Sequence, residues 1–350
     1  ILNLQKVNEG LNAITRGDLD TVINVRAYKE FSDLSDDVNA TVATLRRYIT
    51  EAEERIDKEL EFARQIQHSA LPSVFPPFKG REDFDLFASM DAAREVGGDF
   101  YDFCLPDPHT LIFTIADVSG KGIPAAMFMM TAKTLIKDLA ESGLPVDEVL
   151  TQANKKLCES NDAGMFITVW IGRLDLRTGR LTYANAGHNP PIIRRSGGAC
   201  EYLRAKPNFV LAGLETTRYR LNECELRAGD ELYLYTDGVT EAADAAGGLF
   251  GEERLLKAFA EPAQRTASGV CGAVKRAIEE FVNGEPQSDD ITMLSLRLRA
   301  LTDARAISVY PCMEALPLIA QYLDERLSAA EVFGRLAKRA HIAADEICSN

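Results

Sequence analysis

The spacing of apolar residues changes abruptly at Pro72, and this change divides the chain into two kinds of structure. Before Pro72, apolar residues recur every three or four positions, as they do on one face of a helix. After it, short runs rich in β-branched and aromatic residues alternate with turn residues, which is typical of strands. The chain therefore joins a helical segment to a separate layered domain.

Two helices are predicted before Pro72. The first ends at Gly17-Asp18, a helix-stop signal. The second continues for about four heptads and ends before Pro72, which favours a coiled coil and a homodimer. The alternative is a single amphipathic helix that lies on a globular domain. The two apolar stripes consist of Leu4, Val7, Leu11 and Ile14, and of Val38, Val42, Leu45, Ile49, Ala52, Ile56, Ala63 and Ile66.

The order of helix, Gly17-Asp18-Leu19, linker and Glu30-Phe31-Ser32-Asp33-Leu34 resembles a HAMP signalling module. The resemblance implies a HAMP-like module over residues 1–50 and a coiled-coil linker over 51–72. Such modules sit just inside a membrane helix and control an output domain. The chain starts at Ile1 within a helical pattern, so we expect a piece of a longer protein. The HAMP resemblance implies the cytoplasmic portion of an inner-membrane-anchored bacterial protein, whose membrane segment would lie upstream of this piece.

Residues 73–300 alternate strand and helix patterns. Turn signals between neighbouring strands predict hairpins, and helices grouped between them predict an α+β layered fold. The expected strands are 84–89, 110–117, 166–175, 181–186, 191–195, 231–236 and 291–298. The expected helices are 123–142, 145–161, 252–260 and 268–283.

Four aspartates stand out by their context. Asp117 and Asp237 each end an apolar strand, Asp99 follows Gly97-Gly98, and Asp289 opens the last strand. Carboxylates held at strand ends would repel one another unless cations lay between them. Oxygen ligands select hard ions, so two divalent cations, Mn²⁺ or Mg²⁺, are expected here, where they would activate a water for attack on a phosphate ester.

Together these motifs resemble the PPM (type 2C) protein phosphatases, in their bacterial SpoIIE-like and RsbU-like branch. The resemblance rests on residues 63–67 with Leu71-Pro72, and on residues 95–102, 117–122, 185–191, 235–241 and 289–292. It implies a β-sandwich flanked by helices over residues 73–300. It also implies that Asp117 bridges two metals, that Asp99, Asp237, Asp289 and the Val118 carbonyl add ligands, and that these aspartates are catalytic.

Some roles stay open. Asp290 is an alternative to Asp289, since neighbouring residues on a strand point to opposite faces. Eukaryotic relatives have a histidine after the bridging Asp-Gly where this chain has Ser119-Gly120-Lys121, so leaving-group protonation has no assigned residue. Arg94 is a candidate phosphate ligand with a surface salt bridge as the alternative, and we interpret His188 as structural.

Residues 301–350 predict a short strand at 306–310 and helices at 314–328 and 331–350. Glu346 and Asn350 are four residues apart and share a helix face. This segment resembles the start of an anti-sigma-factor serine kinase domain with the histidine-kinase ATPase fold. The resemblance implies that Glu346 and Asn350 serve an ATP–Mg site in the full-length protein. The alternative is an ordinary solvent-facing helix.

The net charge of the chain limits the classes of molecule that it could bind. The formal net charge of −14 without a Lys/Arg-rich block argues against nucleic acid. Seven scattered cysteines without a CxxC pair favour free thiols in a reducing compartment, and no apolar run approaches the length of a membrane span.

The sequence therefore predicts a metal-dependent phosphoserine/phosphothreonine protein phosphatase in bacterial signalling. By resemblance, its substrate is a phosphorylated anti-sigma-factor antagonist, and the HAMP-like module and coiled coil control it. The alternatives are an inactive phosphatase-fold scaffold and a bifunctional phosphatase/serine kinase. A HAMP-linked nucleotide cyclase is a further alternative, but no second aspartate pair with a downstream arginine supports it.

Overall fold

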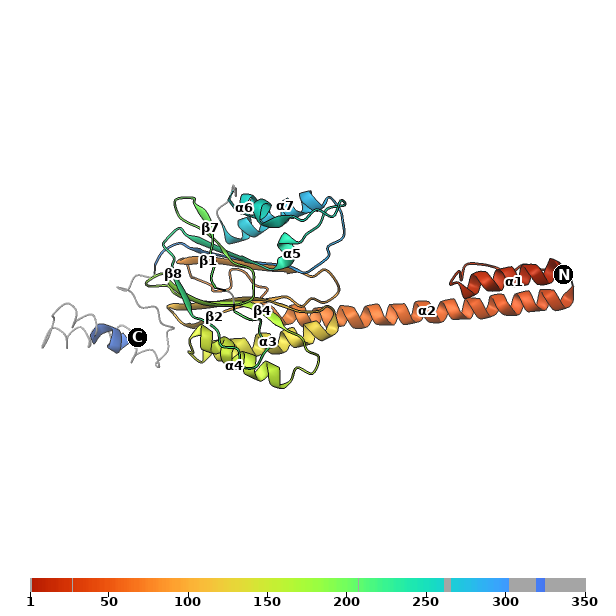
Figure 1. Ribbon diagram of the computed structural model, residues 1–350, viewed down its shortest axis with the longest axis horizontal. Helices are drawn as coiled ribbons and strands as arrows, with labels where there is room; N and C mark the ends of the chain where they lie inside the picture. Colours follow the sequence, from red (N-terminus) through yellow and green to blue (C-terminus); the bar gives the residue numbers. More distant parts are fainter. Residues whose placement is uncertain (1, 27, 207, 261–265, 302–318, 325–350) are drawn as a thin grey trace, which may run out of the picture. The chain divides into compact units, whose positions relative to one another are not determined.

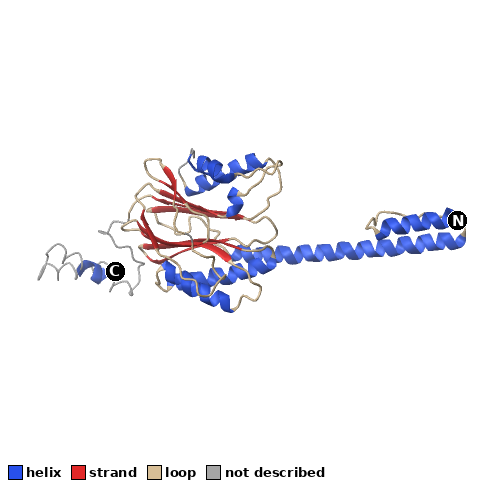
Figure 2. Ribbon diagram, viewed as in Figure 1, coloured by secondary structure: helices blue, strands red, loops and turns tan. Residues whose placement is uncertain are grey.

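The computed structural model describes residues 2–26, 28–206, 208–260, 266–301 and 319–324. It divides into two units, residues 1–66 and 67–350. Figure 1 labels the elements, and Figure 2 separates helices from strands by colour.

The first unit is built from α1 (Leu2–Thr15), an extended segment, and α2 (Lys29–Ala70), which continues into the second unit. In Figure 1, α1 lies beside the first part of α2. The buried apolar residues Val7, Ile23 and Val25 form the small core of the first unit. Gly10 allows the close packing, because a Cβ there would lie 2.6 Å from Cγ1 of Ile23.

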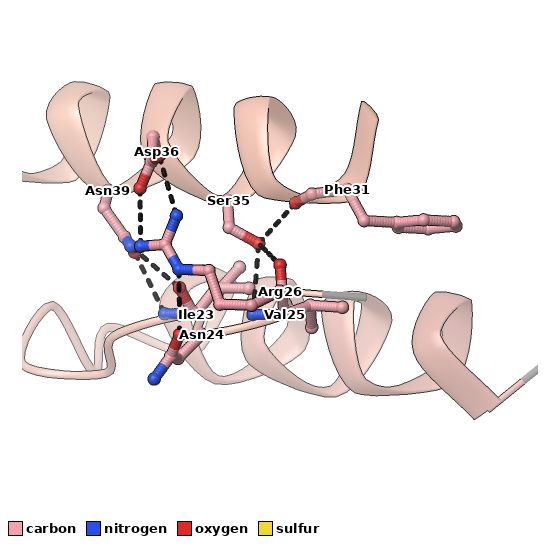
Figure 3. A network of polar contacts seen from close by, with 8 residues as sticks. All are labelled: Ile23, Asn24, Val25, Arg26, Phe31, Ser35, Asp36 and Asn39. Atoms are coloured by element: carbon pink, nitrogen blue, oxygen red, sulfur yellow. Dashed lines mark hydrogen bonds and ion pairs between the residues drawn. The ribbon is translucent and has the colours of Figure 1, made fainter. Parts of the chain in front are cut away.

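Polar side chains of α2 hold the extended segment in place (Figure 3). Asn39 pairs with both backbone groups of Ile23: its Nδ2 donates to the carbonyl at 2.8 Å, and its Oδ1 accepts from the N–H at 2.9 Å. Ser35 donates to Phe31, and its hydroxyl lies near the backbone of Val25. Hydrogen bonds therefore supplement a small apolar core.

The second unit contains two antiparallel five-stranded sheets. The first has the order β1 (Phe84–Asp91), β10 (Ile291–Leu298), β9 (Glu231–Tyr235), β6 (Ile192–Arg194) and β7 (Cys200–Tyr202). The second has the order β2 (Phe100–Asp107), β3 (Thr110–Val118), β4 (Ile167–Asp175), β5 (Arg180–Ala186) and β8 (Asn222–Glu225).

Helices cover the outer faces of both sheets, which gives four layers (Figure 2). Helices α3 (Ile123–Glu141) and α4 (Val146–Glu159) pack on the second sheet. Helices α6 (Gly251–Ala260) and α7 (Ala267–Val282) lie on the side of the first, and the short α5 (Asp237–Thr240) follows β9. The predicted α+β sandwich flanked by helices is confirmed.

A large apolar core lies between the sheets and beneath α3 and α4. It includes Phe113 and Trp170, whose ring centroids are 5.5 Å apart, and Leu294 from the opposite sheet. A second cluster, which includes Tyr233 and Phe259, joins the first sheet to α6 and α7. The seven expected strands and four expected helices of residues 73–300 are present, with ends that differ by at most two residues.

Three strands were not predicted. Strand β2 lacks alternation, since its first four residues are all buried, and β7 and β8 are short strands at sheet edges. The expected strand at 306–310 lies outside the described residues, and of the C-terminal helices only 319–324, which are helical, are described.

Two further expectations concern the whole chain. The described cysteines are all free, namely Cys104, Cys158, Cys200, Cys224 and Cys271. Within the described ranges, none of the helices has the length and apolar character needed to cross a bilayer.

Candidate active site

Asp117 lies at the end of β3, one residue before the strand stops, and is paired in register with Thr168 of β4. Burial is the largest cause that raises the pKa of Asp117 to about 7, and the negative charges of Asp237 and Asp289 contribute to the same rise. The three carboxylates, which are far apart in the sequence, are therefore close enough in space to repel one another.

Asp99 is buried just before β2, with 1% of its surface exposed. Its Oδ2 accepts a hydrogen bond from the Thr236 hydroxyl at 2.7 Å, which fixes the carboxylate beside the end of β9. Burial holds the pKa of Asp99 well above its usual value, and the charges of Asp117 and Asp290 act in the same direction.

Asp237 begins α5, and one residue separates it from the end of β9. Burial raises the pKa of Asp237, and the neighbouring charge of Asp289 adds to this effect. The next residue must be glycine, because a Cβ on Gly238 would lie 2.0 Å from the carbonyl oxygen of Asp290. This close backbone approach brings the turn after β9 against the residues that precede β10.

Asp289 and Asp290 have different surroundings. Asp289 is partly exposed, and its Oδ2 lies 3.0 Å from the Lys121 ammonium. Asp290 is buried and accepts two backbone hydrogen bonds, from the N–H of Ala93 at 2.9 Å and from that of Gly98 at 2.7 Å. Asp290 is thus engaged in holding a loop, whereas Asp289 is directed to the same region as Asp117 and Asp237.

Lys121 was not singled out from the sequence. Besides approaching Asp289, its Nζ donates to the Ser288 carbonyl at 2.7 Å, so it places positive charge among the carboxylates. The only signal in the sequence was its position four residues after Asp117, in a glycine-rich turn. Its partner lies 168 residues further along the chain, so local pattern could not reveal the pair.

The donors fit divalent cations by their chemistry. Carboxylates and a backbone carbonyl are oxygen ligands of the type preferred by Mg²⁺ and Mn²⁺. The Val118 carbonyl lies close to the Gly97-Gly98 segment that precedes Asp99, since a Cβ on Gly98 would lie 2.6 Å from the carbonyl oxygen. Among the described residues, no three His, Cys, Asp or Glu side chains converge closely enough to hold one ion. The charges of Asp237 and Asp289 raise the pKa of Asp117, and that of Asp289 raises the pKa of Asp237, so cations between these carboxylates would relieve the repulsion.

His188 and Arg94 differ in burial. His188 is buried, and its ring Nδ1 is 2.8 Å from the Thr168 hydroxyl. The backbone N–H of His188 donates to Oδ1 of Asn185. Burial lowers the pKa of His188 to about 4, so the ring is neutral near pH 7, as a structural residue would be. Arg94 is exposed on the loop between β1 and β2. Glu346 and Asn350, the predicted nucleotide-site residues, lie outside the described residues.

Solved structures with the same architecture identify the class of domain. The SiaA-PP2C domain of Pseudomonas aeruginosa superposes with a TM-score of 0.62 at 24% identity, covering 70% of this chain and 98% of that domain. The PP2C phosphatase domain of Bacillus subtilis SpoIIE, with a fragment of its regulatory domain, gives 0.55 at 18% identity over 61% and 63% of the two chains. The second unit therefore has the PP2C phosphatase fold.

Sequence comparisons identify the family. The family model described as Stage II sporulation protein E (SpoIIE) matches residues 107–299, and the chain belongs to this family. Phosphoserine phosphatase RsbU of Bacillus subtilis is 32% identical over 247 residues, or 70% of this chain and 71% of RsbU. Protein IcfG of Synechocystis is 28% identical over 329 residues, which are 85% of this chain but only 50% of IcfG.

Proposed function

We propose that this chain is a metal-dependent protein phosphatase that hydrolyses phosphoserine or phosphothreonine on a partner protein. The observation that carries the proposal is the proximity of three carboxylates from separate strand ends: the charges of Asp237 and Asp289 raise the pKa of Asp117, and that of Asp289 raises the pKa of Asp237. The relative RsbU, which is named a phosphoserine phosphatase, supports the substrate class.

Each proposed ligand has its own place. Asp117 faces both Asp237 and Asp289 and would be shared between two ions, while the Val118 carbonyl and Asp99 would complete the set. Two divalent cations, Mn²⁺ or Mg²⁺, when bound would neutralise these carboxylates and activate a water for attack on phosphorus. Lys121 would keep Asp289 oriented, and Arg94, exposed on the adjacent loop, would bind phosphate oxygens. Protonation of the leaving group has no assigned residue.

The partner is proposed to be a phosphorylated protein of the anti-sigma-factor antagonist type. The likeness to RsbU supports this proposal, as does a second relative, phosphoserine phosphatase RsbP of Bacillus subtilis, which is 27% identical over 188 residues. The formal net charge of −14 agrees with a protein partner rather than nucleic acid.

Control by the N-terminal region is proposed through a homodimeric coiled coil. Leu45, Ile49, Ile56 and Ile66 of the expected apolar stripe are between 39% and 55% exposed in the single chain, as the seam of a dimer would be. A HAMP-like module over residues 1–50 would change the packing of this coil. Anchoring to the inner membrane would require a segment upstream, and the catalytic portion would then be cytoplasmic.

The C-terminal region is proposed to begin a histidine-kinase-like ATPase domain. Glu346 and Asn350, spaced to share one helix face, would then serve an ATP–Mg site in the full-length protein and make it a bifunctional phosphatase and serine kinase. Exchange of Glu346→Gln in the full-length protein would abolish ATP-dependent phosphorylation of the partner and leave phosphate release unchanged.

The experiment that tests the main proposal measures phosphate release from a phosphoserine protein with Mn²⁺, with Mg²⁺ and with chelator. Asp117→Asn is expected to lose roughly a thousandfold or more of the rate, while Asp107→Asn, an exposed aspartate on β2, retains it. Equal rates for Asp117→Asn and the parent chain would contradict the proposal. No release from the parent with either ion would favour the alternative, an inactive signalling scaffold.

A further inference from the structure

In the last turn of α2, the side chain of Gln67 contacts the loop that precedes Asp99. This residue belongs to the second unit and is 3% exposed. Its Nε2 donates to the Gly97 carbonyl at 2.6 Å, and its Oε1 accepts from the Gly97 N–H at 3.1 Å. One amide side chain thereby satisfies both backbone polar groups of a residue 30 positions away.

Gly97 is held from a second direction by Asp290. The Asp290 carboxylate accepts from Gly98 and Ala93, and a Cβ on Gly97 would lie only 2.2 Å from its Oδ2. The loop from Ala93 to Gly98 is therefore fixed between a helix end and the start of β10. Removing Gln67 would free one side of this loop, while Asp290 would retain the other.

Asp99 comes two residues after Gly97. Its carboxylate is fixed at one oxygen by Thr236, but the position of its backbone is set by the Gly97-Gly98 segment. On β2, which begins right after Asp99, the Tyr101 hydroxyl donates to the Pro72 carbonyl at 2.7 Å and ties this strand to the residues just after α2. Two contacts thus relate the end of α2 to the Gly97-Gly98 segment before Asp99 and to the strand that follows it.

We propose that Gln67 is a positioning residue for Asp99: its paired hydrogen bonds with Gly97 hold the Gly97-Gly98-Asp99 segment where Asp99 faces Asp117. This inference rests on the proposed function of the site. A displacement of the last turn of α2 reaches Asp99 directly through this contact.

The test compares two glutamines of the same helix. Gln67→Met keeps the length of the side chain and removes its polar groups, and Gln65→Met makes the same change at an exposed position whose amide bonds only to Glu61. The readout is the Mn²⁺ dissociation constant, measured by electron paramagnetic resonance of the free ion without any substrate. We expect Gln67→Met to weaken Mn²⁺ binding at least fivefold and Gln65→Met to change it less than twofold.

Turnover separates positioning from a structural role. With p-nitrophenyl phosphate at saturating Mn²⁺, we expect Gln67→Met to lower kcat at least fivefold and to leave KM within twofold. A purely structural glutamine would lower the melting temperature and leave both the Mn²⁺ affinity and kcat of the folded protein unchanged, which would overturn the proposal. If Gln67→Met does not fold, Gln67→Asn, which keeps the amide on a shorter chain, replaces it. A threefold loss of affinity is then expected, and parental affinity overturns the proposal.

Hydrogen–deuterium exchange keeps this inference separate from the proposed function. If the parent chain binds Mn²⁺ no better than Asp117→Asn, the proposed function fails. The positioning role of Gln67 is then tested by the exchange rates of the backbone amides of residues 97–99. We expect these amides to exchange at least tenfold faster in Gln67→Met than in Gln65→Met. Equal exchange in the two variants overturns the positioning role.

Discussion

Asn39 and Gln67 make the same contact in two different settings. Each is an amide side chain of α2 that pairs with the N–H and the carbonyl of a single residue, Ile23 in the first unit and Gly97 in the second. The Asn39 pair is only part-buried and lies beside a core of three buried residues. The Gln67 pair is fully buried at the margin of a core that spans two sheets.

The difference shows how core size changes what a hydrogen bond does. In the first unit, little apolar surface is removed from water, so polar contacts with the extended segment form a large share of what keeps it in place. In the second unit, apolar packing already determines the fold, and the same contact is available to position one loop. The predictions below test this contrast.

The largest stability effect is expected in the second core. Phe113→Ala, which empties a fully buried site against Trp170, should cost about 4 kcal/mol. Ile23→Ala removes fewer atoms from a smaller core that can relax, and should cost about 2 kcal/mol. Denaturant unfolding of both variants, followed by far-ultraviolet circular dichroism and by tryptophan fluorescence, measures these costs.

Trp170 is the single tryptophan of the chain and lies in the second unit, so its fluorescence reports that unit alone. Ile23→Ala is expected to shift the circular dichroism transition and leave the fluorescence midpoint unchanged, whereas Phe113→Ala shifts both. Should Ile23→Ala move the fluorescence midpoint as far as Phe113→Ala does, the two cores unfold together and the contrast is wrong.

Acid should weaken the second unit through His188. Its pKa is lowered from 6.5 to about 4 by burial. Below pH 6.5 the unfolded chain takes up a proton that the folded chain refuses until about pH 4, so stability falls as the pH falls through this window. The loss amounts to about 3 kcal/mol. Fluorescence-monitored unfolding at pH 7 and at pH 4.5 measures most of it.

His188→Asn removes this titration and should flatten the difference between the two pH values, while exposed His68→Asn should behave as the parent. Parent, His188→Asn and His68→Asn all carry the same aspartates, so their comparison isolates the histidine. A parental pH dependence in His188→Asn would show that another group causes it.

Asp289 and Asp290 should separate activity from stability within the second unit. Asp290→Asn replaces an acceptor of the Ala93 or Gly98 N–H with an amide donor and should cost about 2 kcal/mol. Asp289→Asn should leave stability within about 0.5 kcal/mol, because the side chain is partly exposed, but should remove most Mn²⁺-dependent phosphate release. The reverse result, full activity in Asp289→Asn and none in Asp290→Asn, would exchange their roles.

Local patterns in the sequence predicted most of the fold. Strands such as β1, β3 and β10 have runs of β-branched and aromatic residues bounded by turns, and α2 ends at the residues before Pro72. Strand β2 was not predicted, because burial on both faces leaves no alternation of apolar and polar residues. In addition, the strand starts right after the Gly97-Gly98-Asp99 motif. The short edge strands β7 and β8 carry too few residues to show a period.

Less of the candidate site than of the fold could be predicted from the sequence. An aspartate that ends a strand is visible in the sequence, so Asp117 and Asp237 could be proposed. The partners of Lys121, Asp290 and Gln67 lie between 30 and 197 residues away, and no local spacing encodes such contacts. The tertiary fold brings these helix and loop groups together, which is why the distinct role of Asp290 became evident only in the structure.

The smallest effect is expected at Asn39. Asn39→Leu has a similar shape and leaves both backbone groups of Ile23 without their partner, but water can reach this part-buried site, so the cost should be about 1 kcal/mol. Circular dichroism-monitored unfolding measures it, with exposed Thr41→Ala as the control. Because the first core is small, even this loss should lower the midpoint of the helical transition visibly while tryptophan fluorescence stays unchanged. If Asn39→Leu stabilises the helical transition, apolar burial rather than the hydrogen-bond pair limits the first unit, and the contrast with Gln67 disappears.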